Sequence, residues 1–396
     1  MLFRLLATAT ATVALCSLGT PSASASTDHL QRELDGVVRD VGVPGALMTV
    51  TGRTTVTVRS GTGDLRTGRP VPANGQVRVG STTKAFVATA VLQLVGEGEV
   101  VLDSPVETYL PGVVRGRGGD GREITVRQLL QHTSHLPDPG PLLPSGGREW
   151  ADQRFRHHDR DKLIRYALAQ EPTTAPWSYT NTGYLLLGKL IEEVTGAWSW
   201  RDEVHRRIAR PLKLRHTYSP HPSAYRIKGP HPRGYVRAPE FIDVTEQDTG
   251  YLDAAGDMVS TPVEINRFFS ALLQGRLLRP AELAEMRRMV PAGGAVDEYG
   301  LGLETNHLSC GDLVGHAGQM HGYSTLAGVL VDRRGRPGAA VTLSITTEPK
   351  DMSDFRRALK AVDTALCTTP ADKPSPGEWL ACSPRPSTGF AGSSRG

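Results

Sequence analysis

A serine stands three residues before a lysine in the stretch "GSTTKAF", at residues 80–86. Side chains three positions apart on a helix lie on the same face, so the Lys84 amine can reach the Ser81 hydroxyl. Such an amine can activate a serine nucleophile, and the backbone N–H of Ser81 can face a developing oxyanion. The structural alternative is that Ser81 only caps the helix while Lys84 is solvated.

A second stretch, "WSYTNTGY", places Tyr179 and Asn181 just before an apolar helical segment. A phenol in this place can relay a proton to a leaving group. The Asn181 amide can hold both Lys84 and the carbonyl of a substrate. The same residues could equally form an ordinary loop that caps a helix.

A third stretch, "GHAGQMHGY", starts with His316, Ala317 and Gly318 and leads directly into a strand. Small residues allow a substrate backbone to lie against a strand edge. An edge N–H can then complete an oxyanion hole with the N–H of Ser81. A lone histidine beside a strand can equally be a structural residue. The functional interpretation therefore depends on all three stretches occurring in this order.

In that order, "STTK", "YTN" and "HAG" resemble the S-x-x-K, Y-x-N and K/H-T-G motifs of the serine β-lactamase and penicillin-binding protein superfamily. The chain is more closely similar to the branch with class C β-lactamases and secreted D-alanyl-D-alanine carboxypeptidases. Connecting segments such as "ITVRQLLQHTSHLPD" and "YGLGL" carry the same resemblance, which covers most of the chain.

The resemblance implies an acyl-serine mechanism without a metal or cofactor. It makes Ser81 the acylated nucleophile, Lys84 its general base or base partner and Tyr179 the proton relay. The implied substrate-binding and oxyanion groups are the side chain of Asn181, the strand residues His316, Ala317 and Gly318, and the backbone N–H groups of Ser81 and Gln319.

Three positions depart from the carboxypeptidases that the chain resembles. Ala317 and Gln319 stand where those proteins have threonines, and Glu304 stands where an arginine helps to hold the carboxylate of the substrate. The loss of two hydroxyl donors and the gain of an acid weaken the capture of a free carboxylate. These departures favour an esterase or a β-lactamase as alternatives.

The predicted function is a secreted serine hydrolase of the D-alanyl-D-alanine carboxypeptidase type. Its expected partners are peptidoglycan peptides or other small acyl substrates, with β-lactams possible. The alternatives are an esterase or β-lactamase on the same scaffold and, third, a non-catalytic penicillin-binding protein. The intact set of Ser81, Lys84, Tyr179 and Asn181 argues against the third.

Alternating and periodic segments predict the elements that must position these residues. "GALMTV" and "TTVTVRSG" form an antiparallel hairpin around Gly52-Arg53, and "YSTLAGVLVD" and "GAAVTLSITT" form two further strands. A first helix is expected over residues 28–40, the helix after Ser81 is expected to end at Gly96, and a last helix is expected to have Ser353 as its N-cap.

This pattern predicts an α/β (α+β) fold of the β-lactamase/transpeptidase-like type. An antiparallel sheet would be closed by N- and C-terminal segments, residues 26–100 and 263–367, and flanked by helices. Residues 101–262, rich in short helical stretches, would form a helical insertion. The Pro/Ser/Gly-rich tail, residues 368–396, is expected to be disordered.

Residues 1–25 have one arginine, an apolar stretch and a small-residue end, which predict a signal peptide cleaved near Ala25. The mature protein would be secreted and would have no membrane segment; the alternative is a lipid anchor at Cys16, although Leu15 is bulky for that processing site. The formal net charge of +4, without a lysine or arginine run, gives no indication of nucleic-acid binding.

Removal of the signal peptide leaves three of the four cysteines, which allows at most one intramolecular bridge. Cys310 and Cys367 lie in segments that look ordered, whereas Cys382 lies in the tail. The predicted disulfide therefore joins Cys310 to Cys367.

Overall fold

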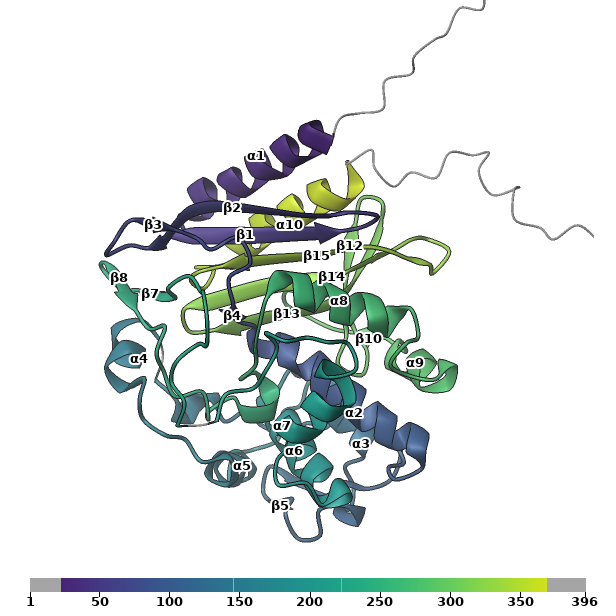
Figure 1. The fold of residues 1–396 in the computed structure, drawn as a ribbon. Coiled ribbons are helices and arrows are strands. Elements are labelled where there is room, and N and C mark those ends of the chain that lie inside the picture. Colours follow the sequence, from purple (N-terminus) through teal and green to yellow (C-terminus); the bar gives the residue numbers. More distant parts are fainter. Residues whose placement is uncertain (1–22, 145, 222, 369–396) are drawn as a thin grey trace, which may run out of the picture.

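The structure is a computed structural model that describes residues 23–144, 146–221 and 223–368 (Figure 1). Its centre is a nine-stranded antiparallel sheet with the order β10-β11-β12-β13-β14-β15-β1-β2-β3. The strands are β1 (Gly45–Thr51), β2 (Thr55–Asp64), β3 (Arg69–Pro70), β10 (Val290–Pro291), β11 (Glu298–Tyr299), β12 (Glu304–Leu308), β13 (Gly311–Met320), β14 (Tyr323–Val331) and β15 (Pro337–Ile345).

The two ends of the chain meet in the middle of this sheet. β1 pairs antiparallel with β15, from the Ala46–Ile345 pair to the Thr51–Ala340 pair. β1 and β2 form the expected hairpin, and β14 and β15 are the two strands that flank the sequence "RRGRP". The predicted fold class, a sheet closed by N- and C-terminal segments and flanked by helices, is confirmed.

Two helices from opposite ends of the sequence, α1 (Ala23–Val41) and α10 (Met352–Cys367), cover one face of the sheet (Figure 1). Their apolar residues form one core with Ala46 and Met48 of β1. Leu47, between them, points to the other face and belongs to the second core, as expected for successive strand residues. The helix α8 (Pro262–Leu273) packs on that second face against β1, β14 and β15.

Beyond α8 lies a layer of helices and short irregular segments (Figure 1). Its helices are α2 (Thr83–Glu97), α3 (Val126–Gln131), α4 (Gly147–Gln153), α5 (Arg160–Leu168), α6 (Asn181–Thr195), α7 (Trp200–Val204) and α9 (Pro280–Met286). The same part of the chain has the short turns η1 (Gly80–Thr82), η2 (Val106–Thr108), η3 (Gly140–Leu142), η4 (His205–Ala209) and η5 (Asp253–Ala255). Three small hairpins or strand pairs complete it: β4 (Val77–Arg78) with β9 (Val259–Ser260), β5 (Arg115–Gly116) with β6 (Gly119–Asp120), and β7 (Tyr235–Arg237) with β8 (Phe241–Asp243).

Helix α2 runs through the centre of this layer and is buried on nearly all sides. Its Phe86 ring stacks on Phe268 of α8, with the ring centroids 3.6 Å apart. The expected end at Gly96 is wrong, because the helix continues to Glu97 and Gly98 adopts the left-handed conformation that ends it. The buried packing of α2 fixes the position of the residues in its first turn.

The last helix also begins differently from the prediction. Asp351, and not Ser353, is the N-cap of α10, since its carboxylate accepts hydrogen bonds from the backbone N–H groups of Ser353 and Asp354. An aspartate at the N-cap satisfies two free amides and also favours the positive end of the helix dipole.

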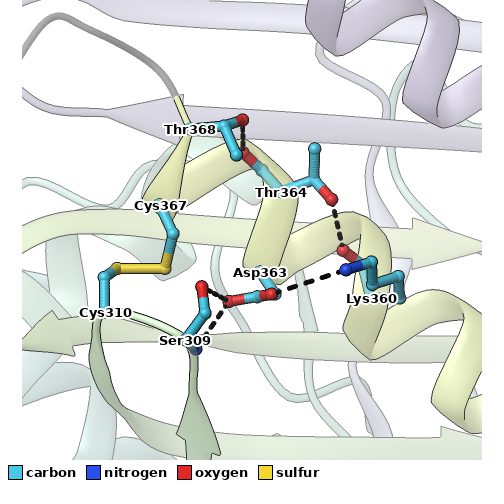
Figure 2. Close-up of a disulfide and its surroundings, with 7 residues drawn as sticks. All are labelled: Ser309, Cys310, Lys360, Asp363, Thr364, Cys367 and Thr368. Carbon is cyan, nitrogen blue, oxygen red and sulfur yellow. Dashed lines mark hydrogen bonds and ion pairs between the residues drawn. A yellow bond between two sulfur atoms is a disulfide. The ribbon is translucent and has the colours of Figure 1, made fainter.

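A disulfide joins Cys310, in the turn between β12 and β13, to Cys367 at the end of α10 (Figure 2). The predicted pairing is therefore confirmed. Beside it, the Asp363 carboxylate accepts hydrogen bonds from the backbone N–H and the hydroxyl of Ser309, at 2.9 and 2.7 Å. The turn is thus bound to α10 by both covalent and polar contacts.

Most of the predicted signal peptide and nearly all of the predicted tail, with Cys16 and Cys382, lie outside the described residues. Within the residues that are described, no helix combines the length and apolar character needed to cross a bilayer. The described residues also contain no cluster of three or more His, Cys, Asp or Glu side chains placed to hold a metal ion.

Candidate active site

Ser81 lies in η1, immediately before α2, and Lys84 lies in the first turn of that helix. The Lys84 Nζ is 3.0 Å from the Ser81 Oγ. It also donates hydrogen bonds to the Asn181 Oδ1 at 2.8 Å and to the backbone oxygen of Ala255 at 2.7 Å. The structure thus brings together the serine, lysine and asparagine that the sequence singled out.

Burial changes the protonation of Lys84. Its side chain is fully enclosed, and this loss of hydration lowers the pKa of the amine to about 7, although the carboxylates of Asp138 and Glu304 oppose the shift. A substantial fraction of the amine is therefore neutral near pH 7. A neutral amine in contact with the Ser81 hydroxyl can accept its proton.

Tyr179 completes the polar group around Ser81. Its phenol is a hydrogen-bond partner of the Ser81 hydroxyl, and the Lys84 Nζ lies 4.8 Å from the centre of its ring. Burial raises the pKa of the Tyr179 phenol well above its ordinary value. The phenol therefore stays protonated. It can give its proton to another group only if it receives a proton at the same time.

The ring of Tyr179 is positioned by a residue that the sequence analysis missed. The imidazole of His132 packs against it, with ring centroids 4.2 Å apart, and the His132 Nδ1 accepts a hydrogen bond from the backbone N–H of Thr180 at 3.3 Å. His132 follows α3 in the left-handed conformation and is fully buried. The sequence signal for His132 was its position directly after the apolar helical stretch in "RQLLQHTS".

Asn181 is the first residue of α6, and a second missed residue holds it there. The Asp138 Oδ2 accepts a hydrogen bond from the backbone N–H of Asn181 at 2.6 Å. The negative charge of Asp138 also favours the protonated form of Lys84. Its only sequence signal was its place at the end of the segment "ITVRQLLQHTSHLPD".

The end of β13 packs directly against η1, which requires glycine at two positions. A Cβ atom on Gly80 would lie 2.6 Å from the backbone nitrogen of Gln319, and one on Gly318 would lie 1.9 Å from the backbone oxygen of Val79. A Cβ on Gly318 would also stand 3.0 Å from the nitrogen of Ser81. The close approach brings the nitrogens of the two predicted oxyanion-hole residues to the same side of the site.

The backbone of β13 has a free edge next to Ser81. Within the described residues, β12 pairs with β13 only as far as the Glu304–Gly315 pair. The Ala317 N–H points to this edge and donates to the Glu304 Oε2 at 2.7 Å. The N–H of Gln319, two residues further along, points to the same edge because backbone groups alternate along a strand. An extended substrate can therefore pair with this edge while its carbonyl faces Ser81.

His316 lies deeper than expected. Its side chain is fully buried, and its Nε2 shares a hydrogen bond with the Tyr299 hydroxyl at 2.9 Å. Its Nδ1 faces the backbone oxygen of Ala317 at 2.5 Å and the Glu304 carboxylate at 3.3 Å. Burial lowers the pKa of His316 to about 3, with a smaller contribution from the Lys84 charge, so the ring is neutral at pH 7. It supports the strand from behind and does not line the pocket described next.

A pocket of about 200 Å³ opens beside Ser81 and extends over the α10 face of the sheet. The predicted substrate-binding residues Ala317 and Gly318 line it, and so do the other two departures noted above, Glu304 and Gln319. The remaining lining residues are Ser81, Tyr179, Ala295, Val296, Ser324, Thr325, Leu326, Leu343, Ile345, Pro349, Phe355 and Ala358.

Glu304 is an ionisable group buried at the wall of this pocket, with only 4% of its surface exposed. Burial raises the pKa of its carboxyl to about 7, while the hydrogen bond from the Ala317 N–H and the charge of Lys84 oppose the shift. Glu304 directly follows "YGLGL" and is the first residue of β12, so it places an acid beside the free edge of β13.

The family model described as Beta-lactamase matches residues 30–366. The chain belongs to the β-lactamase family. This family of serine hydrolases includes members related to penicillin-binding proteins, esterases and amidases, and the superfamily assignment from the three motifs is confirmed.

Several relatives in the β-lactamase family are similar over most of their length. Penicillin-binding protein 4* of Bacillus subtilis (strain 168) is 28% identical over 77% of this chain and 68% of its own length. Esterase EstB of Burkholderia gladioli is 29% identical over 71% of this chain and 79% of its own. The crystal structure of a D-stereospecific amidohydrolase from Streptomyces sp. is 35% identical, has a TM-score of 0.76, and the match covers 87% of this chain and 99% of that one.

Proposed function

We propose that this protein is a secreted serine hydrolase that cleaves amide or ester bonds of D-amino-acid derivatives through an acyl intermediate on Ser81. One observation carries the proposal: the enclosed Lys84 amine, with a pKa of about 7, lies 3.0 Å from the Ser81 hydroxyl. A serine needs such a base to become nucleophilic. The similarity to a D-stereospecific amidohydrolase supports the class of substrate.

Acylation begins when the neutral Lys84 amine takes the proton of Ser81, while the Ser81 oxygen attacks the substrate carbonyl. The oxyanion that forms lies between the backbone N–H groups of Ser81 and Gln319. The C–N or C–O bond then breaks, and the departing amine or alkoxide takes the Tyr179 proton, which Lys84 replaces. The site returns to a neutral amine and an acylated serine.

Deacylation repeats these steps with water as the nucleophile. The Lys84–Tyr179 pair takes a proton from water as the water oxygen attacks the acyl carbon, and the same oxyanion hole holds the intermediate. The bond to the Ser81 oxygen breaks, and that oxygen recovers its proton. Asn181 remains bound to Lys84 through its carbonyl oxygen, which leaves its amide group to hold an acyl carbonyl.

Cleavage of D-alanyl-D-alanine peptides of the cell wall, the activity predicted from the sequence, stays a second candidate. The similarity to penicillin-binding protein 4* favours it. Ala317 and Glu304 argue against this activity. In the carboxypeptidases that the chain resembles, the residues at these two positions help to hold the free carboxylate of the substrate. An esterase activity, which the relationship to EstB supports, uses the same steps with an alcohol as leaving group.

The test combines mass spectrometry with substrate turnover. The intact protein is incubated with benzylpenicillin, and both its mass and the loss of the drug are followed; in parallel, D- and L-phenylalanine amide and D-alanyl-D-alanine are assayed. Preferred turnover of the D-amide supports the proposal, and a lasting adduct on Ser81 with turnover of D-alanyl-D-alanine supports the second candidate. Rapid drug loss without turnover of either D-substrate would identify a β-lactamase, and acylation at a serine other than Ser81 would refute the mechanism.

A further inference from the structure

We propose that Glu304 and the apolar pocket beyond Ala317 form a leaving-group subsite, which accepts an uncharged, apolar amine or alcohol and rejects one with a free carboxylate. The inference rests on the proposed function, since it names which part of the substrate this pocket receives. A suitable leaving group is an amidated D-amino acid with an aromatic or branched side chain.

The position of the pocket indicates the leaving group. Ser81 and Tyr179 line it, whereas Asn181 does not. The departing atom must lie near Tyr179, because it takes the phenol proton when its bond to the carbonyl carbon breaks. The part of the substrate next to that atom therefore lies at the entrance of the pocket, and the acyl part lies toward Asn181.

The negative charge of Glu304 at the entrance of the pocket disfavours a leaving group that carries a free carboxylate. Glu304 is buried, and its carboxylate contacts the Ala317 N–H at 2.7 Å and the Nδ1 of the neutral His316 at 3.3 Å, while the charge of Lys84 acts on it without forming an ion pair. Among the described residues, no lysine or arginine forms an ion pair with it. Above pH 7 the Glu304 carboxyl is mostly ionised and the Lys84 amine is mostly neutral, so a substrate carboxylate would meet a like charge at a buried group, where repulsion is strong.

The walls beyond the entrance are mostly apolar, although Ser324 and Thr325 also line the pocket. Leu326 and Leu343 face the pocket from neighbouring strands, and Phe355 and Ala358 face it from the first two turns of α10. A dry apolar cavity of ~150 Å³ in another protein binds benzene. The volume of about 200 Å³ in this protein therefore suits an aromatic ring or a branched aliphatic chain.

Alanines along α10 create this space. Ala358 lines the pocket, while Ala361, on the next turn, is fully buried in the core between α10 and the sheet. A larger side chain at position 358 would fill the pocket from the helix side. The same change at Ala361 would crowd the helix–sheet contact without entering the pocket, and it is therefore a matched control.

The experiment compares substrates that share one acyl group, N-acetyl-D-alanyl. It is joined to D-phenylalanine amide, to D-phenylalanine with a free carboxylate, or to glycine amide, and kcat/KM is measured at pH 8. We expect the aromatic amide to exceed both others by about tenfold or more, because it gains apolar burial and avoids charge repulsion. Equal values for the three substrates would overturn the inference.

Two variants assign the effects to the named residues. Glu304→Gln should raise kcat/KM for the free acid relative to the aromatic amide by about tenfold, and Glu298→Gln on β11 is the control for a glutamate outside the pocket. Ala358→Leu should remove most of the preference for the aromatic amide over glycine amide, whereas Ala361→Leu should retain it. The ratios stay valid even where a variant is partly unfolded.

The outcomes separate this inference from the proposed function. If Ser81 is not acylated by any of the substrates, the proposed function fails. If Ser81 is acylated but Ala358→Leu instead reduces selectivity for an aromatic group in the acyl part, tested with N-acetyl-D-phenylalanyl-glycine amide, the pocket is an acyl subsite. In that case only the inference fails.

Discussion

The two sides of the active site differ in how closely they follow the family pattern. On the helical side, Ser81, Lys84, Tyr179 and Asn181 match the motifs of the β-lactamase family and contact one another directly or through Lys84. On the strand side, Ala317 and Glu304 depart from the pattern of the carboxypeptidases that the chain resembles, and they line a mostly apolar pocket. We therefore expect proton transfer to depend mainly on the helical side and the choice of substrate mainly on the strand side.

The largest effect should come from the nucleophile. Ser81→Ala removes the attacking oxygen, so we expect kcat/KM to fall by about 10⁴-fold or more and covalent labelling by acylating agents to disappear. The melting temperature should change little, because Ser81 is only partly buried. Mass spectrometry after exposure to benzylpenicillin or an activated ester checks the labelling. Adducts that persist on another serine would show that the helical side is not the reacting side.

Loss of the base should have the next largest effect. In the wild type, the acylation rate should rise with pH around a midpoint near 7, because the neutral form of Lys84 takes the serine proton and its fraction grows above the pKa of about 7. Lys84→Arg keeps the positive charge at all accessible pH values. We expect it to lower acylation by about 10²-fold to 10⁴-fold and to abolish this rise. Stopped-flow acylation profiles from pH 5 to 9 test this, and an unchanged profile in Lys84→Arg would assign the base to another group.

A smaller effect on substrate preference is expected from Glu304, on the strand side of the site. The preference for an amide over the matching free acid should grow as pH rises through about 7, because the pKa of Glu304 lies there and its charge repels the acid only above it. The ionisable groups that interact with Glu304 are Lys84, His316, Tyr179, Tyr184 and Tyr299.

As the base, Lys84 serves both substrates, but its charge also attracts the free acid below its pKa of about 7. Comparison with Glu304→Gln therefore isolates the contribution of Glu304, and in that variant the ratio should rise much less with pH. A rise as large as in the wild type would assign the titration to a group other than Glu304.

The disulfide should have the smallest effect on catalysis. It closes a loop between residues 57 positions apart and joins the β12–β13 turn to α10, one wall of the pocket. The double variant with Cys310→Ser and Cys367→Ser should lose about 2–4 kcal/mol of unfolding free energy. Its kcat for small amides should remain close to that of the wild type, as measured with urea denaturation and steady-state assays. A large loss of kcat would show that the two sides of the site are not independent.

Local patterns allowed many features to be predicted. The hairpin of β1 and β2, the strands β14 and β15 and the pairing of Cys310 with Cys367 all followed from alternation, turn residues and cysteine positions. The last residue of a helix was harder to predict, because a glycine at position 96 or at position 98 can end a helix equally well. Only the left-handed conformation of Gly98 distinguishes them.

The sequence by itself determined the order and spacing of the reactive groups. A serine and a lysine three residues apart on a helix lie on the same face, so their contact was predictable from local geometry once a helix was expected there.

Only the tertiary structure decided the contacts between distant segments. Lys84 and Asn181 are 97 residues apart, and Glu304 reaches Ala317 because β12 ends where the edge of β13 becomes free. The burial of His316, the support of Tyr179 by His132 and the pocket next to Ala358 likewise arise from packing. Packing sets the burial of a side chain and its neighbouring charges, which in turn set its pKa and the substrates it can meet.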